Sequence, residues 1–234
     1  MTMIRFWGQV HYATQTKKMS GYELFLREQD ESGEQWAVPA NIDLIVPMRL
    51  VRMLEDTLPT LPDKLDHVTL NMNRSQFLNP SYLMLLGRLK QTLDLNLGIE
   101  LVGHDEHGNE QVPIEKLKQQ AAAYQKAGLL LILDEVGTGH NGRELAEALD
   151  PYVWGYKYTL QSTRGVLTRD DAIAQVGEWR FLARRQGKQF ALSGIETASD
   201  VKLIGRRQPD YVQGFYFGKP NPLATLNDLK VEDD

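Results

Sequence analysis

Two adjacent carboxylates, Asp134 and Glu135, are the side chains of this 234-residue chain whose spacing most directly suggests chemistry. They follow five aliphatic residues, 129–133, and precede a turn with glycines at 137 and 139. The run is short enough to be a strand buried on both faces, as in a parallel sheet. The carboxylates would then lie at its carboxyl end, where α/β folds place their active sites and where oxygen donors could hold a divalent cation. A solvated acidic turn explains the same residues equally well.

Other polar side chains fall at the carboxyl ends of other predicted strands. They are Asn71, Glu100 and Gln213, with Lys157 near the end of its own strand. Glu23 lies within a strand that is apolar on both sides, which is a costly place for a lone charge unless a cation compensates it. Each of these residues has an ordinary structural explanation when taken singly. Their convergence on one barrel mouth favours a site for a hard cation.

The five histidines indicate less. His104, His107 and His140 fall in predicted polar loops, and solvent exposure explains them better than metal binding. His11 and His67 lie in or beside predicted strands and are expected to be structural.

The elements that must position these side chains alternate between strand and helix from Val68 onwards, which is typical of βαβ units. The predicted strands are 6–12, 21–27, 66–71, 95–102, 129–133, 152–159, 189–193 and 210–217. The predicted helices are 42–58, 78–93, 113–127, 141–149, 168–186 and 199–207, and a linker is predicted at 59–62. Pro47 would kink the first helix or mark its true start. About eight strands, the first two forming an antiparallel hairpin, favour an α/β barrel over an open sheet. One domain, 1–234, with a loose acidic tail at about 227–234 is the simplest account.

The bulk composition excludes several classes of function. The net charge is −5 and no long basic run is present, which argues against a nucleic-acid polymer as partner. The absence of cysteine excludes disulfides and thiolate metal sites. The first residues lack a signal-peptide layout, and no apolar run is long enough to cross a bilayer. A cytoplasmic protein without membrane contact is expected.

The motifs that carry these residues resemble those of the EAL-domain family, the cyclic di-GMP phosphodiesterases. The resemblance covers residues 9–222, and its carriers are 21–27, 70–73, 99–101, 134–139, 156–157, 193–197 and 210–217. It implies a modified TIM-type (β/α)8 barrel with one antiparallel strand. It also implies two-metal hydrolysis of cyclic di-GMP to linear diguanylate with Mg²⁺ or Mn²⁺.

The resemblance also implies roles for individual residues. The first cation would be held by Glu23, Asn71, Glu100 and Asp134, with Glu135 beside them. The substrate-binding set would be Arg27, which would contact a phosphate, together with Gln9 and Gln213. Lys157 would assist the attacking water, and Glu196 would steady the loop after the central strand.

Several positions depart from the family pattern. Ser193 replaces a glutamate expected at the second cation, Thr159 replaces an acid two residues after the lysine, and Glu135 replaces an aspartate. The remaining departures are Gly103 for an acid, Val136 for a phenylalanine, and Glu-Leu-Phe at 23–25 for the signature triplet. Serine cannot replace the charge of a carboxylate, and the extra methylene of Glu135 moves its oxygens by about 1 Å, a shift that can cost ~10²-fold in rate.

These departures favour a divergent EAL domain with impaired or absent hydrolysis, one Mg²⁺ or Mn²⁺ site and a weakened second one. Its role would be to bind cyclic di-GMP or a protein partner, and a homodimer is plausible for the family. The alternatives are an active metal-dependent cyclic di-GMP phosphodiesterase and a structural scaffold that binds neither metal nor nucleotide.

Overall fold

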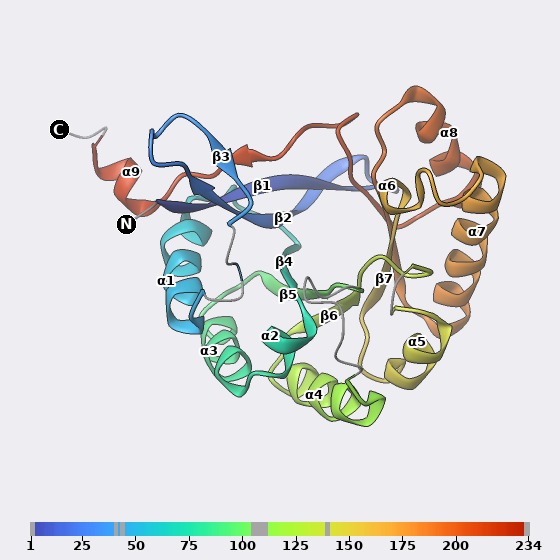
Figure 1. Cartoon of the computed structure of the whole chain (residues 1–234), viewed down its shortest axis with the longest axis horizontal. Coiled ribbons are helices and arrows are strands. Elements are labelled where there is room, and N and C mark those ends of the chain that lie inside the picture. Colours follow the sequence, from blue (N-terminus) through green and yellow to red (C-terminus); the bar gives the residue numbers. More distant parts are fainter. Residues whose placement is uncertain (1–2, 40–41, 43–44, 104–111, 139–140, 232–234) are drawn as a thin grey trace.

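The computed structural model describes residues 3–39, 42, 45–103, 112–138 and 141–231. Its strands close into a ring in the order β1-β9-β8-β7-β6-β5-β4-β2, because β1 also pairs with β2 (Figure 1). The predicted barrel is therefore confirmed. The ring strands are β1 (Ile4–Ala13), β2 (Lys18–Gln29), β4 (His67–Met72), β5 (Asn96–Leu101), β6 (Leu130–Leu133), β7 (Gly155–Thr159), β8 (Gln189–Ser193) and β9 (Tyr211–Val212).

The direction of β1 departs from that of the other strands. β1 runs antiparallel to both β2 and β9, whereas the pairs from β2 through β4, β5, β6, β7 and β8 to β9 are parallel. The opening hairpin predicted from the sequence is thus part of the ring. Two short strands, β3 (Trp36–Ala37) and β10 (Asn221–Pro222), pair with β2 and β1 and were not predicted.

The longer helices lie around the outside of the strands (Figure 1). The helices are α1 (Pro47–Thr57), the 3₁₀ turn η2 (Leu58–Thr60), α2 (Arg74–Leu78), α3 (Pro80–Lys90), α4 (Ile114–Lys126), α5 (Arg143–Leu149), α6 (Leu160–Thr163), α7 (Arg169–Gln186), α8 (Ala198–Arg207) and α9 (Leu226–Val231). Among the described residues, no helix is both long and apolar enough to traverse a bilayer.

Local sequence signals explain where several elements begin and end. Pro47 occupies the first turn of α1, where its missing N–H costs nothing, so the helix starts there and not at Ile42. The Thr168 side chain accepts a hydrogen bond from the Asp171 N–H and caps α7, and Gly187 ends that helix with φ +67°. β6 has four residues, of which 131–133 are buried, in agreement with the predicted strand enclosed on both faces.

Three predictions from the sequence are wrong in part. The predicted helix 78–93 is the shorter α3, which begins at Pro80 and ends at Lys90, and Leu78 belongs to the separate helix α2, which was not predicted. The predicted strand 210–217 is only β9, because the chain turns at Gly214, where a Cβ would come within 2.1 Å of the Ile195 oxygen. The tail expected to be loose contains α9.

α9 lies beside the start of β1 (Figure 1). Asp228 forms an ion pair of 2.7 Å with Arg5, which holds the helix against the barrel. The linker predicted at 59–62 also contains regular structure, because η2 occupies its first part.

Candidate active site at the carboxyl end of the barrel

A hollow of about 290 Å³ opens at the carboxyl ends of the parallel strands. The predicted site residues that line it are Gln9, Glu23, Asn71, Asp134, Glu135, Lys157, Glu196 and Gln213. Glu100 lies within the same group and is buried, with 1% of its surface exposed. The structure therefore brings together nine of the ten predicted site residues, the eight that line the hollow plus Glu100. Arg27 is not among the residues that line the hollow; it lies further along β2.

Lys157 lies at the centre of three buried carboxylates. Its Nζ is 2.8 Å from Glu23 Oε2, 2.5 Å from Glu100 Oε2 and 3.3 Å from Asp134 Oδ2. These residues lie on β2, β5 and β7 and directly after β6, so the barrel closure itself brings them together. Three carboxylates and one ammonium group, all ionised, give −3 + 1 = −2. A single divalent cation would neutralise that charge.

Neutral hydrogen-bond donors hold the same carboxylates in place. Asn71 Nδ2 donates to Glu23 Oε1 at 2.5 Å, and Gln213 Nε2 donates to Glu23 Oε2 at 2.8 Å. Thr69 Oγ1 donates to Glu100 Oε1 at 2.6 Å. The alternation of strand side chains allows this contact, since Thr69 and Glu100 come from the adjacent strands β4 and β5. The carboxylate oxygens are thus fixed before any ligand arrives.

Burial changes the proton affinities of this group. Burial and the charge of Glu23 raise the pKa of Glu100 to about 8, and burial raises the pKa of Asp134 to about 6. Burial also opposes ionisation of Glu23, but Lys157 outweighs it and lowers the pKa of that carboxyl. Burial alone would lower the pKa of Lys157, yet Asp134, Glu100 and Glu23 raise it well above its ordinary value. A proton on Glu100 therefore serves as part of the charge compensation near neutral pH.

At the ends of β7 and β8, the last side chains of the strands are the neutral hydroxyl groups of Thr159 and Ser193. Thr159 Oγ1 and Ser193 Oγ lie 2.7 Å apart and hydrogen-bond to each other, and Thr159 also donates to Asp134 Oδ1 at 3.3 Å. Glu135 has φ +50° and accepts a hydrogen bond from Ser162 Oγ at 2.5 Å through Oε1. Its carboxylate is thus drawn towards α6.

Comparison with known proteins shows the family to which the chain belongs. The model of the EAL domain family matches residues 8–220. This chain belongs to the EAL domain family. A curated relative, the probable cyclic di-GMP phosphodiesterase PdeG of Escherichia coli strain K12, is 24% identical over 190 residues, which is 76% of this chain and 35% of that protein. The chain therefore spans about a third of the length of that relative.

Solved EAL structures share the fold. The YkuI protein of Bacillus subtilis, with an EAL domain in complex with cyclic di-GMP and calcium, superposes with a TM-score of 0.75 at 19% identity, covering 98% of this chain and 60% of that one. The EAL domain of FimX from Pseudomonas aeruginosa, bound to cyclic di-GMP, gives 0.75 at 16% identity, covering 93% of this chain and 90% of that one. These likenesses support the barrel described above.

The oxygen donors of this EAL domain fit a divalent cation. Hard cations such as Mg²⁺ and Mn²⁺ take carboxylate and amide oxygens, and the buried group offers Glu23, Asn71, Glu100 and Asp134 with a formal charge that one such ion would cancel. On the Thr159–Ser193 side the donors are hydroxyl groups, which are weak and neutral ligands.

Two predicted residues have surroundings that the sequence did not indicate. Glu196 forms an ion pair with Arg164, which also lies 3.3 Å from Asp200, so the described partner of Glu196 belongs to the segment after α6. The Arg27 guanidinium lies 5.7 Å from the centroid of the Phe25 ring, and Phe25 lines the hollow. Their roles in loop support and phosphate contact remain predictions.

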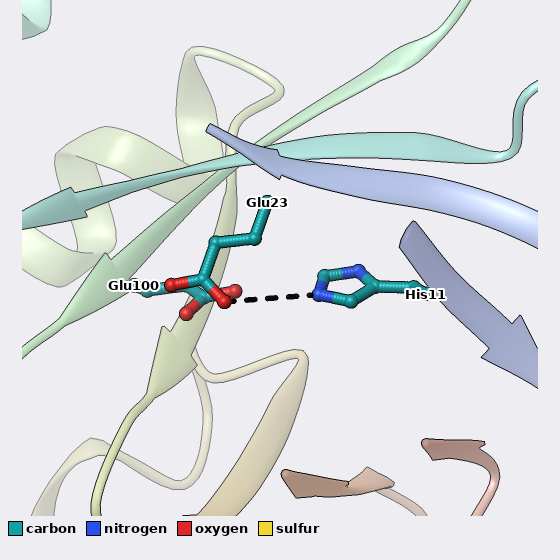
Figure 2. A group of neighbouring side chains, drawn as sticks. All are labelled: His11, Glu23 and Glu100. Carbon is teal, nitrogen blue, oxygen red and sulfur yellow. Dashed lines mark ion pairs between the residues drawn. The ribbon is translucent and has the colours of Figure 1, made fainter. Parts of the chain in front are cut away.

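Sequence reasoning overlooked two residues that support the EAL site. Asn141 is fully buried and donates from Nδ2 to both the Leu101 and the Asp134 carbonyl oxygens at 2.7 Å, which fixes the end of β6. An asparagine at a predicted helix start gives no signal for this role. His11 was expected to be structural, yet it faces Glu23 and Glu100 (Figure 2). His104, His107 and His140 lie outside the described residues.

Proposed function

We propose that this EAL domain binds cyclic di-GMP together with one divalent cation and hydrolyses it slowly or not at all. The observation that carries the proposal is the division of the hollow into two unlike halves. Glu23, Glu100 and Asp134 form a charged, buried half, whereas Thr159 and Ser193 form a neutral half that is already hydrogen-bonded.

Ligand binding is supported by the family and by the retained donors. FimX and YkuI have cyclic di-GMP bound in their structures. In this chain, the guanidinium of Arg27 would contact a phosphate, because a planar donor fork matches phosphate oxygens. Gln213 Nε2 donates a hydrogen bond of 3.0 Å to Gln9 Oε1 beside Glu23, where both side chains would face the same ligand.

A Mg²⁺ or Mn²⁺ ion held by Glu23, Asn71, Glu100 and Asp134 would supply Lewis-acid chemistry to a phosphodiester. With that ion bound, the carboxylates would no longer depend on Lys157 for charge compensation. Its ammonium group would then be available to orient an attacking water, as the family resemblance implies. Glu23 would keep its hydrogen bonds from Asn71 and Gln213 and so would stay in place.

Hydrolysis is expected to be impaired because the neutral half offers little charge to a second cation. Loss of one cation of a pair removes several kcal/mol of transition-state stabilisation, and each ~1.36 kcal/mol is a factor of ten in rate. Glu135 does not replace the missing carboxylate at Ser193 directly, since its Oε1 accepts from Ser162.

The rival proposal is an active phosphodiesterase, and two observations favour it. PdeG is described as a probable cyclic di-GMP phosphodiesterase, and Glu135 still lines the hollow beside Asp134. A third reading, binding of a protein partner without nucleotide, stays a prediction, as do the homodimer and the cytoplasmic location.

Calorimetric titration with cyclic di-GMP in Mn²⁺, followed by chromatography for linear diguanylate, separates these proposals. We expect binding, weakened by Arg27→Ala and unchanged by Arg52→Ala, which removes the same charge from the exposed face of α1. We expect turnover far below the 1–10³ s⁻¹ typical of enzymes. Turnover within that range would establish the rival proposal, and absence of binding at high micromolar ligand would leave only the protein partner.

A further inference from the structure

His11 is a buried imidazole whose ring points towards the carboxylates of Glu23 and Glu100 (Figure 2). Its Nε2 lies 4.0 Å from Glu23 Oε2. One ligand atom each from His11, Glu23 and Glu100 lie within 4.8 Å of one another. A modest contraction around an ion would bring all three into a first coordination shell, since metal–ligand bonds of about 2.0–2.2 Å place donors roughly 3 Å apart.

We propose that His11 Nε2 is a nitrogen ligand of the cation held by Glu23 and Glu100, and that it shifts the preference of the site from Mg²⁺ towards Mn²⁺ and Co²⁺. The proposal rests on the proposed function only in placing a cation at these carboxylates. It does not require that cyclic di-GMP binds or is hydrolysed.

The second ring nitrogen of His11 has the partner that such a ligand needs. His11 Nδ1 lies 2.9 Å from His67 Nε2, so in the tautomer with a proton on Nδ1 that N–H donates to His67. Nε2 then keeps its lone pair, 4.0 Å from Glu23 Oε2, and the Gln213 side chain also interacts with this ring. Metal-binding histidines are usually oriented in this way by a hydrogen bond from the other ring nitrogen. His67 is therefore a positioning residue for His11.

A glycine next to the two histidines leaves room for the His67 ring. Gly21 lies against the His67 ring, and a Cβ at Gly21 would come within 2.2 Å of the His67 oxygen and 2.9 Å of its ring. Trp154 and Tyr211 pack on the other faces of His67, with ring centroids 5.7 Å and 5.1 Å away. The orientation of His67, and through it that of His11, is thus fixed by packing.

The chemistry of the donor set explains the expected preference. Mg²⁺ binds almost entirely through oxygen and loses its water reluctantly, whereas transition-metal ions also accept imidazole nitrogen, with an affinity that rises from Mn²⁺ to Co²⁺. The neutral imidazole is the form that binds a metal. A set of one nitrogen with two carboxylates therefore favours Mn²⁺ and Co²⁺ over Mg²⁺, by a ratio that we expect to exceed ten.

The test uses the full chain with metal alone, without nucleotide. Mn²⁺ bound to the protein is probed by pulsed electron paramagnetic resonance for coupling to a histidine nitrogen. We expect that coupling in the native protein, its loss in His11→Ile, and its retention in a variant with His104, His107 and His140 changed to asparagine. Competition titrations should show the Mn²⁺/Mg²⁺ affinity ratio of His11→Ile lowered about tenfold.

Native protein that binds Mn²⁺ without histidine coupling overturns the proposal, as does coupling that survives in His11→Ile. Absence of any cation binding at millimolar Mn²⁺ also overturns it. Should His11→Ile not fold, the native spectrum and that of the variant without the loop histidines decide alone. Cyclic di-GMP binding is measured separately. Loss of that binding with histidine coupling retained contradicts the proposed function alone, whereas loss of the coupling with Mn²⁺ bound contradicts the nitrogen ligand alone.

Discussion

The two halves of the hollow contrast in how they meet the cost of burying polar groups. In the charged half, Glu23, Glu100 and Asp134 share one ammonium group and keep a formal charge of −2 when all are ionised. In the neutral half, Thr159 and Ser193 hydrogen-bond to each other, and Thr159 also donates to Asp134. The charge of the first half is balanced only when a further positive charge binds, whereas the second half has no carboxylate charge to balance. The rim of one barrel can thus keep the carboxylates that bind one cation and lack those that would bind a second.

The largest expected effect comes from removing the shared ammonium group. Lys157→Met should lower the free energy of unfolding of the cation-free protein by about 3–5 kcal/mol at pH 8, because it leaves buried carboxylates uncompensated. Urea denaturation measures this, and saturating Mn²⁺ should restore most of the loss. The matched control is Lys188→Met, whose partner Asp150 is more exposed and 3.5 Å away; we expect a loss below about 1 kcal/mol. Equal losses would erase the distinction between the buried group and an ordinary ion pair.

Restoring charge to the neutral half should have the next largest effect. Thr159→Asp combined with Ser193→Glu is expected to raise the number of bound Mn²⁺ ions from one to two and the rate of cyclic di-GMP hydrolysis by ~10²-fold or more. Stoichiometry comes from calorimetry and rate from product chromatography. Thr159→Asn with Ser193→Gln adds similar volume without charge and should change neither. A second ion in the native protein would show that the two halves are not unlike in the way we describe.

The Mn²⁺ affinity of the charged half should depend on pH. Glu100 and Asp134, with pKa values of about 8 and about 6, hold protons that a cation must displace. Mn²⁺ affinity should therefore rise by roughly 10²-fold from pH 6 to pH 8, mostly through Glu100, with proton release measurable by calorimetry in buffers of different ionisation enthalpy.

The stability of the cation-free protein should move in the opposite direction. Both carboxyls have folded-state pKa values above their unfolded values, so their stabilising contribution is present at pH 4 and is lost as the pH rises through 6 to 8. A pH-independent Mn²⁺ affinity would contradict the raised pKa values.

The smallest expected effect is on the neutral half alone. Ser193→Ala removes the hydrogen bond to Thr159 and should cost about 1 kcal/mol of unfolding free energy, because a typical hydrogen bond contributes that amount. Mn²⁺ affinity should change less than twofold. A large loss of affinity in this variant would place Ser193 among the cation ligands and would overturn the division.

Much of the barrel followed from the sequence because its signals are local. The alternation of strand and helix from Val68 predicted the parallel sheet, and the polar residues at strand ends predicted the rim. The turn at Gly214 was not predictable, because it depends on the close approach of Ile195, nearly twenty residues earlier in the chain. Periodicity alone could not separate a two-residue strand from a longer one.

The role of individual side chains was less accessible for the same reason. The sequence indicates a special role for Glu23 because a lone charge in an apolar strand is costly. It gives no such signal for His11, whose proximity to Glu100 arises only when the barrel closes. Asn141 likewise acts on the carbonyl oxygens of Leu101 and Asp134, which belong to two different strand ends. Such contacts are set by closure of the ring and leave no trace in spacing.

Because β9 is short, the number of paired residues differs strongly around the ring. β9 contributes only two residues to its pairings with β1 and with β8, while β1 and β2 are joined along ten register positions. Local opening costs least where few backbone hydrogen bonds must break, so amide hydrogens at this seam should exchange with solvent sooner than those of the hairpin. The pairing of β9 ends directly before Gln213, which lines the hollow, so local opening of β9 would disturb the wall of the hollow at that residue.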